Sequence, residues 1–262
     1  MVRLGDVFPY IRNGASIQQD KNPSGYPITR IETIADGAVN RNKMGYAGIK
    51  KIEPYYSYIL QDGDILMSHI NSVSHLGKAA RYKRQDDEII IHGMNLLNLR
   101  ADDKRINNHF AYYFFTSYAF KKQLPNITKN SVNQSSFNIT ALKELQIFLP
   151  PLPIQQKIAD VLDRASTLIE KRKAQIEKLD LLLKSQFVEM FGDPVTNPMG
   201  WEVANFYEVT TKIGSGATPR GGKESYINEG ISLIRSMNVY NGFFKYKLLL
   251  WTCSFFKLSF YG

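Results

Sequence analysis

The chain has 262 residues, of which 44% are hydrophobic, and it carries a formal net charge of +9 at pH 7. This composition supports one or two packed domains, and the single cysteine, Cys253, excludes an internal disulfide and favours a reducing, cytoplasmic setting. No apolar run approaches the ~18 residues of a membrane span and no signal-peptide pattern is present, so no membrane partner is expected.

Residues 1–150 are expected to form one module of mixed strands and short helices, in the α+β class. Short apolar runs, separated by turn signals rich in Gly, Pro, Asn and Asp, indicate strands. The expected strands cover residues 28–34, 64–68, 88–91, 96–99 and 145–149. An aromatic-rich helix is expected over residues 110–123 with Asn107 or Asn108 as its cap, and the polar residues 126–138 indicate a loop.

The excess positive charge is unevenly distributed. Residues 1–150 contain 19 Lys and Arg against 13 Asp and Glu, a net charge of +6, whereas residues 151–200 contain seven of each. Residues 201–262 have a net charge of +3, from seven basic and four acidic side chains. Two basic modules on either side of a neutral segment favour a polyanion such as duplex DNA as partner. A solvated basic surface without a partner is the alternative.

Within residues 1–150, three segments bring basic and amide side chains together. The candidate DNA-binding residues are Arg41, Lys43, Lys78, Arg81, Lys83, Arg84, Lys129, Asn130, Asn133 and Gln134. Lysine and arginine can hold phosphates, and Asn or Gln can make two hydrogen bonds to adenine. For the densest segment, around Lys83, the alternative is an exposed strand face whose charge is balanced by Asp86, Asp87 and Glu88.

The next segment is expected to be one long helix. Residues 154–190 contain neither proline nor glycine, follow Pro150-Pro151-Leu152-Pro153, and stop at Phe191-Gly192-Asp193-Pro194. At ~1.5 Å per residue such a helix is about 55 Å long, whereas the mean helix has about 11–12 residues. A rod of this length usually separates or pairs other modules.

Apolar residues recur along this helix with the seven-residue spacing of a coiled coil. The expected helix-pairing residues are Ile158, Leu162, Ala165, Ile169, Ile176, Leu179, Leu183 and Met190. Arg172 and Gln186 interrupt the second row. A heptad repeat of this length predicts a partner helix, which can be that of a second copy of the chain. The alternative is a single amphipathic helix packed on its own domain.

The start of residues 193–262 has sequence motifs similar to those at the start of residues 1–150. Gly14-Ala15-Ser16 corresponds to Gly216-Ala217-Thr218-Pro219, and in both copies an arginine precedes a glycine by seven residues inside a strand-like run. Repeats of this kind indicate duplicated modules. Since the first module needs about 150 residues, the second is expected to be incomplete. Its aromatic-rich end is expected to be an atypical tail, left by a truncated or shifted reading frame.

These motifs together resemble the specificity subunit of type I restriction–modification systems. The most specific is Leu149-Pro150-Pro151-Leu152-Pro153-Ile154-Gln155-Gln156-Lys157-Ile158 with the helix after it, which is similar to that family's first spacer. Gly63-Asp64-Ile65-Leu66 and Leu76-Gly77-Lys78-Ala79 resemble a strand–loop pair of its target recognition domain. The resemblance covers residues 1 to about 244.

The resemblance implies three parts: a target recognition domain over residues 1–150, a spacer helix over 151–192 and a partial second recognition domain over 193–262. In that family each recognition domain reads one half of a split DNA target. The spacer helices hold the domains apart and bind methyltransferase subunits, and a restriction/translocase subunit joins for cleavage. The implied role is DNA recognition without a catalytic centre or a cofactor.

Catalytic motifs are missing from the sequence. Neither Asp193-Pro194-Val195 nor Asn197-Pro198-Met199 supplies the Pro-Pro-aromatic loop of an amino-methyltransferase. Residues 217–224 lack the first glycine of a phosphate-binding loop and place Glu224 at its magnesium-binding position. Two other functions stay open, namely a coiled-coil adaptor that binds only protein and a stand-alone DNA-modifying enzyme.

Overall fold

The computed structural model describes residues 1–20, 25–35, 37–131, 134–216, 222–240 and 242–252. The chain divides into two compact units, Met1–Leu183 and Lys184–Gly262. We call the part of the first unit that precedes the long helix the N-terminal domain. Its mixed strands and short helices, followed by that helix, confirm the expected α+β class.

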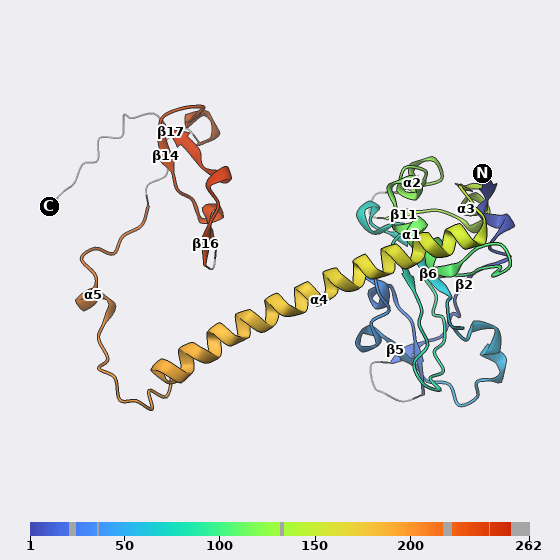
Figure 1. Cartoon of the computed structure of the whole chain (residues 1–262), viewed down its shortest axis with the longest axis horizontal. Helices are drawn as coiled ribbons and strands as arrows, with labels where there is room; N and C mark the ends of the chain where they lie inside the picture. Colours follow the sequence, from blue (N-terminus) through green and yellow to red (C-terminus); the bar gives the residue numbers. More distant parts are fainter. Residues whose placement is uncertain (21–24, 36, 132–133, 217–221, 241, 253–262) are drawn as a thin grey trace. The chain divides into compact units, whose positions relative to one another are not determined.

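Short elements make up the N-terminal domain (Figure 1). Its strands are β1 (Val2–Arg3), β2 (Tyr10–Asn13), β3 (Gln19–Asp20), β4 (Tyr26–Ile28), β5 (Gly45–Ala47), β6 (Ile65–Ser68), β7 (Ile70–Asn71), β8 (Ala79–Arg81), β9 (Leu96–Arg100), β10 (Lys129–Asn130), β11 (Ser135–Ser136) and β12 (Gln146–Ile147). Its α-helices are α1 (Asn108–Thr116), α2 (Tyr118–Lys121) and α3 (Ile139–Glu144). Its 3-10 helices are η1 (Leu4–Asp6), η2 (Ile31–Ile34), η3 (Arg41–Lys43), η4 (Glu53–Tyr58), η5 (Val73–His75) and η6 (Leu124–Asn126).

The core is built around an antiparallel sheet in the order β2-β9-β6-β8. Ile65 on β6 lies opposite Leu99 on β9, and Leu66 lies opposite Ala80 on β8. Because successive side chains of a strand point to opposite faces, Ile65 and Met67 pack in the cluster that contains α1 and α2, whereas Leu66 packs in a second cluster. Both faces of the sheet are therefore buried, which explains the continuous apolar run of β6.

The helix expected over residues 110–123 is two helices. The Asn107 side chain accepts hydrogen bonds from two backbone N–H groups of the first turn of α1, which confirms the predicted cap. The Ser117 hydroxyl donates to the carbonyl of Phe114 and accepts from the backbone N–H of Phe120. Since this side chain competes with the helical backbone for hydrogen bonds, it ends α1 and begins α2.

The strand expected over residues 28–34 is wrong beyond its first residue. Strand β4 ends at Ile28, and the chain then turns into η2. The Thr33 hydroxyl accepts a hydrogen bond of 2.9 Å from the backbone N–H of Arg30. This local bond replaces a bond that the residue would make in a sheet, and it starts the helical turn.

The strand expected over residues 88–91 is also wrong. The carboxylate of Glu88 accepts a hydrogen bond of 2.9 Å from the backbone N–H of Gln85 and holds a turn. Ile91 makes only isolated bridges, to Ile28 and Ile59. The apolar run therefore fills the core as extended chain without a continuous ladder. By contrast, β6 and β9 confirm the strands expected near residues 64–68 and 96–99.

A buried carboxylate fastens β6 to β9. Asp64 is almost completely buried, and its two oxygens lie 2.8 Å from Nε and Nη2 of Arg100. The side-chain amide of Asn98, at 2.8 Å, and the backbone N–H of Gln61, at 2.9 Å, donate to the same carboxylate. The Arg100 guanidinium also lies 4.7 Å from the centre of the Tyr10 ring. The carboxylate thus accepts four hydrogen bonds, one at Oδ1 and three at Oδ2.

Two buried histidines occupy the same domain. His92 is fully buried, and its Nε2 lies 3.0 Å from the carbonyl oxygen of Leu96. Burial lowers the pKa of His92 to about 4, and burial also lowers the pKa of His69 below its ordinary value. Both rings are therefore neutral in the folded protein near pH 7.

We expect the N-terminal domain to lose stability in weak acid. The unfolded chain binds protons at His92 below about pH 6.5, whereas the folded chain binds them only near its lowered pKa. Stability therefore falls as the pH drops through this window, by about 2 kcal/mol between about pH 7.5 and about pH 5. Urea unfolding at the two pH values measures this difference. A His92→Leu variant should show a smaller loss than the parent, whereas replacing exposed His75 with glutamine should leave the loss unchanged.

The second unit has few elements. They are α5 (Phe206–Val209), the 3-10 helices η7 (Gly222–Ser225), η8 (Ser236–Asn238) and η9 (Tyr246–Leu248), and strands β13 (Tyr226–Ile227), β14 (Ile231–Leu233), β15 (Val239–Tyr240), β16 (Phe243–Phe244) and β17 (Leu250–Thr252). The strands form a sheet in the order β13-β17-β14 and a hairpin of β15 with β16.

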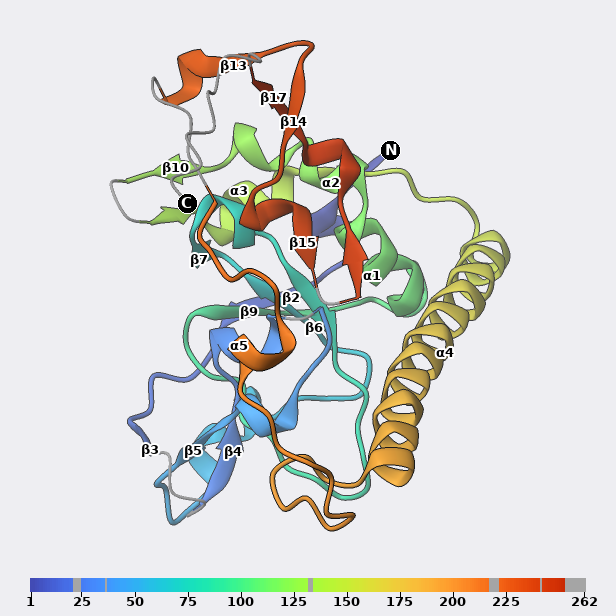
Figure 2. The ribbon, with the colours of Figure 1, turned by 90° about the vertical axis from the view of Figure 1, so that its left-hand side faces the viewer.

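The sheet of the second unit repeats a sheet of the first. In the first unit β5 lies between β3 and β4, at the end of the domain opposite α2 in both views (Figures 1 and 2). Tyr26 is paired with Ala47 there, and Ile231 is paired with Thr252 in the second unit. The paired positions of the two units are 205 residues apart. The duplication suggested by the sequence is therefore present in the backbone.

The turn that follows each sheet strand is also repeated. The backbone N–H of Arg30 and that of Arg235 each donate to the side chain three residues further on. Gly37 and Gly242, seven residues after these arginines, both adopt positive φ angles, of 78° and 81°. Residues 217–219 of the repeated Gly-Ala motif and the expected atypical tail at 253–262 lie outside the described residues.

The long helix α4 (Leu152–Phe191) is uninterrupted and has 40 residues, which confirms the expected rod. It is followed directly by Gly192, whose φ of 78° is a left-handed conformation that glycine adopts without strain. Among the described helices, none is both long enough and apolar enough to cross a membrane.

Candidate nucleic-acid interface

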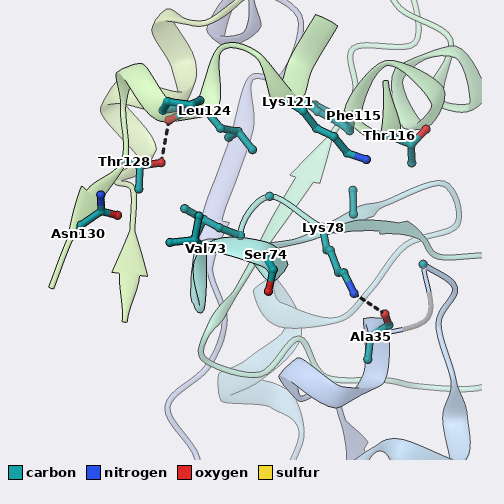
Figure 3. A pocket seen from close by; sticks show the side chains of 15 residues that line it. Ala35, Val73, Ser74, Lys78, Phe115, Thr116, Lys121, Leu124, Thr128 and Asn130 are labelled. Atoms are coloured by element: carbon teal, nitrogen blue, oxygen red, sulfur yellow. Dashed lines mark hydrogen bonds between the residues drawn. The ribbon is translucent and has the colours of Figure 1, made fainter. Parts of the chain in front are cut away.

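A cavity of about 680 Å³ brings together two candidate residues from distant segments, Lys78 and Asn130 (Figure 3). Lys78 directly follows Gly77, whose φ is 71°; a Cβ atom there would lie 2.5 Å from Cδ1 of Leu124. Only glycine fits this close approach, so the turn into β8 fixes the base of Lys78 at the cavity wall. Its Nζ donates to the carbonyl oxygen of Ala35 at 3.1 Å.

The lining of this cavity combines apolar side chains with positive charge. Val73, Phe115 and Leu124 contribute apolar atoms, while Lys78 and Lys121 contribute two ammonium groups. Figure 3 shows Lys121 extending from α2 on the wall across from Lys78. Among the described lining residues there is no Asp or Glu. The local field therefore favours an anionic group at this position.

The segment expected to be a loop after α2 contains a short hairpin. Strand β10 pairs with β11, and β11 in turn pairs with β7 of the strand–loop segment before Gly77. Lys129, Asn130 and Gln134 are exposed on this hairpin. The Oδ1 atom of Asn130 accepts a bond of 2.8 Å from the Ser135 hydroxyl, which orients the amide. Asn133 lies outside the described residues.

Arg41 is committed to an ion pair inside the domain. Its Nε lies 2.8 Å from Oε2 of Glu88, a second nitrogen contacts Oε1, and that nitrogen also donates to the carbonyl of Lys83. The Tyr82 hydroxyl donates to the same carboxylate at 2.9 Å. The Arg41 guanidinium is the largest cause that lowers the pKa of Glu88 to about 2. Arg41 therefore holds η3 against the segment that follows β8.

The other basic candidates lie around that ion pair or on β8. Lys83 and Arg84 are exposed directly after Tyr82, and Lys43 is exposed at the end of η3. Arg81 is half-buried on β8, and its charge acts on the Tyr112 hydroxyl of α1. The candidates thus form two groups, one at the cavity and hairpin and one around Glu88. Within the described ranges, no three His, Cys, Asp or Glu side chains could hold a metal ion.

The expected helix-pairing residues are divided in the structure. Ile158 and Leu162, in the first turns of α4, are only 38% and 37% exposed and line an apolar groove of about 620 Å³ with Phe110 and Phe114. The later members are exposed in the single chain. They are Ala165, Ile169, Ile176, Leu179, Leu183 and Met190. An exposed apolar row of this length, although Arg172 and Gln186 lie between its members, is typical of a surface that binds another protein element.

Comparison with known proteins identifies the family. The family model described as "Type I restriction modification DNA specificity domain" matches residues 1–178. A protein of Methanocaldococcus jannaschii, named as a candidate type I restriction enzyme MjaX specificity subunit, is 38% identical over 245 residues, 88% of this chain and 57% of that protein. The chain belongs to the type I specificity-subunit family.

Other members of the specificity-subunit family are more distant. The type I restriction enzyme EcoKI specificity subunit of Escherichia coli is 22% identical over 72% of this chain and 42% of its own length. A solved structure from a study of type I R-M complex assembly has a TM-score of 0.51 and 20% identity, and the match covers 71% of this chain and 42% of that one, which shows a shared fold. The chain spans about half the length of the curated relatives it matches.

One basic residue at the cavity of this specificity-subunit chain is missing from the sequence candidates. Lys121 is at the end of α2, within the segment expected to be an aromatic-rich helix, and only the fold places it opposite Lys78. The Lys121-Lys122 pair on an otherwise apolar aromatic helix is the signal that could have indicated it. Arg41 is the opposite case, a sequence candidate that the structure pairs within the domain. Its partner Glu88 is 47 residues away in the sequence, so the pair has no local signal.

Proposed function

We propose that this chain is the DNA-recognition subunit of a type I restriction–modification complex and that residues 1–150 read one half of a bipartite duplex site. The observation that carries the DNA assignment is the convergence of Lys78, Lys121 and Asn130 on one cavity whose described lining holds no acidic side chain. Family membership over residues 1–178 supports the same assignment.

In the proposed interface, charged side chains contact the phosphates and amide side chains contact the bases. Exposed Lys121 and Lys129 hold backbone phosphates, and Lys83 and Arg84 extend the basic surface. These contacts give affinity that depends on salt but carry no sequence information. Asn130 and Gln134 on the hairpin supply the donor and acceptor pairs that can read base edges.

The assignments of the other parts of the chain rest on membership of the specificity-subunit family. Residues 151–192 are the spacer, whose exposed apolar row binds helices of methyltransferase subunits or of a second chain. Residues 193–262 belong to a second recognition domain. Methyl transfer belongs to the methyltransferase subunits, and cleavage needs the restriction/translocase subunit, so this chain contributes recognition and has no catalytic centre or cofactor.

A second copy of the chain can supply the second reader. An antiparallel pairing of two α4 helices centred near Ala174 places Ile158 opposite Met190 and Ile169 opposite Leu179. Each layer then joins one residue of each heptad row, as antiparallel coiled coils require. The resulting two-fold dimer carries two identical N-terminal domains and fits a split site with two-fold symmetry.

We expect removal of two exposed lysines to weaken DNA binding in a salt-dependent way. The double variant Lys121→Ala/Lys129→Ala should lower the slope of log affinity against log salt by about two, since each phosphate contact contributes about one. Fluorescence anisotropy with a random-sequence duplex measures the slope. The matched control, Lys171→Ala/Lys173→Ala on exposed positions of α4, removes the same charge and should keep the parent slope.

The same titration separates the alternatives. A protein-only coiled-coil adaptor would show no salt-sensitive duplex binding, and equal slopes for the two double variants would contradict the proposed interface. Methyl transfer or DNA cleavage by the purified chain would instead support a stand-alone DNA-modifying enzyme.

A further inference from the structure

The start of α4 is fixed to the N-terminal domain by one buried glutamine. Gln155 is completely buried although it is polar and lies on the long helix. Its Oε1 accepts the backbone N–H of Asn107 at 2.8 Å, and its Nε2 donates to the carbonyls of Pro150 at 2.8 Å and Arg105 at 3.1 Å. One side chain thus connects the linker before α4, the loop before α1 and the cap of α1.

A second attachment lies two to three helical turns further along. The Oδ1 atom of Asp163 accepts the Tyr113 hydroxyl at 2.7 Å, and its Oδ2 lies 2.7 Å from Nδ1 of His109. The Ser166 hydroxyl lies 3.2 Å from the same tyrosine oxygen. His109 and Tyr113 of α1 therefore contact polar side chains of α4. Ile158 of α4 lines the apolar groove together with residues of α1.

Two separated attachments fix a direction, whereas one allows pivoting. From Gln155 to Ser166 the helix advances ~17 Å, and from Ser166 to its last residue, Phe191, it advances ~38 Å. A deviation of about 10° at the attachments therefore moves the far end of α4 by about 7 Å, the length of about two base pairs. Hydrogen bonds at two points along the helix, together with the packing in the groove, restrict this angle.

We propose that Gln155 and Asp163 are positioning residues that set the direction in which α4 leaves the N-terminal domain. The consequence for DNA, a fixed gap between the two half-sites, rests on the proposed function. The direction itself does not, and it can be measured without DNA. This role also gives a physical reason for a buried glutamine directly after the proline-rich entry of the helix.

The test measures the distance between the domain and the helix by pulsed electron resonance. Spin labels replace exposed Lys83 and Glu177 in a Cys253→Ser background, and labelled chains are diluted with unlabelled chains so that only distances within one chain are read. We expect a narrow distribution for the parent and a distribution at least twice as wide for Gln155→Leu and for Asp163→Ala. The matched control is Gln175→Leu, an exposed glutamine in the middle of α4, which should keep the parent width.

Asp163 is partly exposed, with 42% of its side chain accessible, so its replacement tests the inference even where the Gln155 variant fails to fold. Parent-like widths in Asp163→Ala, together with parent-like widths in any folded Gln155→Leu, would overturn the inference and leave the proposed DNA reading intact. Wide distributions in these variants with a parent that binds no duplex would support the inference and overturn the proposed function.

Discussion

Replacing Asp64 with alanine should lower the free energy of unfolding of the N-terminal domain by about 3–5 kcal/mol, because it leaves the Arg100 guanidinium beside the core without its partner. Arg100 is only 29% exposed, and it loses both of its 2.8 Å hydrogen bonds. The side-chain amide of Asn98 and the backbone N–H of Gln61 lose their acceptor as well. Urea unfolding followed by circular dichroism measures the loss.

The control for this variant is Asp87→Ala, which removes an exposed carboxylate of the same domain and should change stability by no more than about 0.5 kcal/mol. A second arm removes both charges. Asp64→Leu/Arg100→Met should be more stable than Asp64→Ala, since an apolar pair leaves no buried charge unpaired. Equal losses for Asp64→Ala and Asp87→Ala would contradict the assignment of this ion pair as a structural centre.

The double variant Ile169→Asp/Leu179→Asp should convert a self-associated chain into a monomer. Both side chains are exposed in the single chain, at 56% and 58%, and they lie opposite each other in the proposed antiparallel pairing. Each would contribute ~2 kcal/mol of apolar burial, and a two-fold pair contains each residue twice, which gives a loss of ~8 kcal/mol. At 1.4 kcal/mol per factor of ten, association weakens by more than about 10⁵-fold.

Light scattering at micromolar concentration measures the change in mass. The control Glu177→Asp/Lys178→Arg alters exposed side chains between the two positions while keeping their charge, and it should stay associated. A parent chain that is already monomeric under these conditions would show that α4 does not pair with itself. Its apolar row would then be reserved for helices of other subunits.

The features that the sequence predicts well are those that depend on neighbouring residues. The absence of proline and glycine over 154–190 is enough for α4, and Asn107 caps α1 through backbone groups two and three residues away. The strands expected over 28–34 and 88–91 fail although the interactions that replace them are equally local. Side-chain bonds of Thr33 and Glu88 to the backbone override the apolar pattern, and such bonds leave no periodic signal.

The candidate site could be predicted only in part, because its side chains come from segments that are distant in the sequence. Sequence adjacency groups Lys78 with Arg81 and Arg84, whereas the fold places Lys78 beside Asn130 and opposite Lys121. Charge counting also cannot tell that Arg41 is neutralised, because the pairing depends on tertiary structure. The heptad rows, in contrast, are visible in the sequence because the helix that carries them is regular.

The most direct test of the central claim is selection from a library of random duplex DNA by the full chain at low salt. A DNA reader held on a spacer should enrich two short motifs separated by a constant gap, with the two-fold symmetry of a dimer. Enrichment of no motif, with duplexes recovered at random, would contradict the claim that this chain recognises a bipartite DNA sequence.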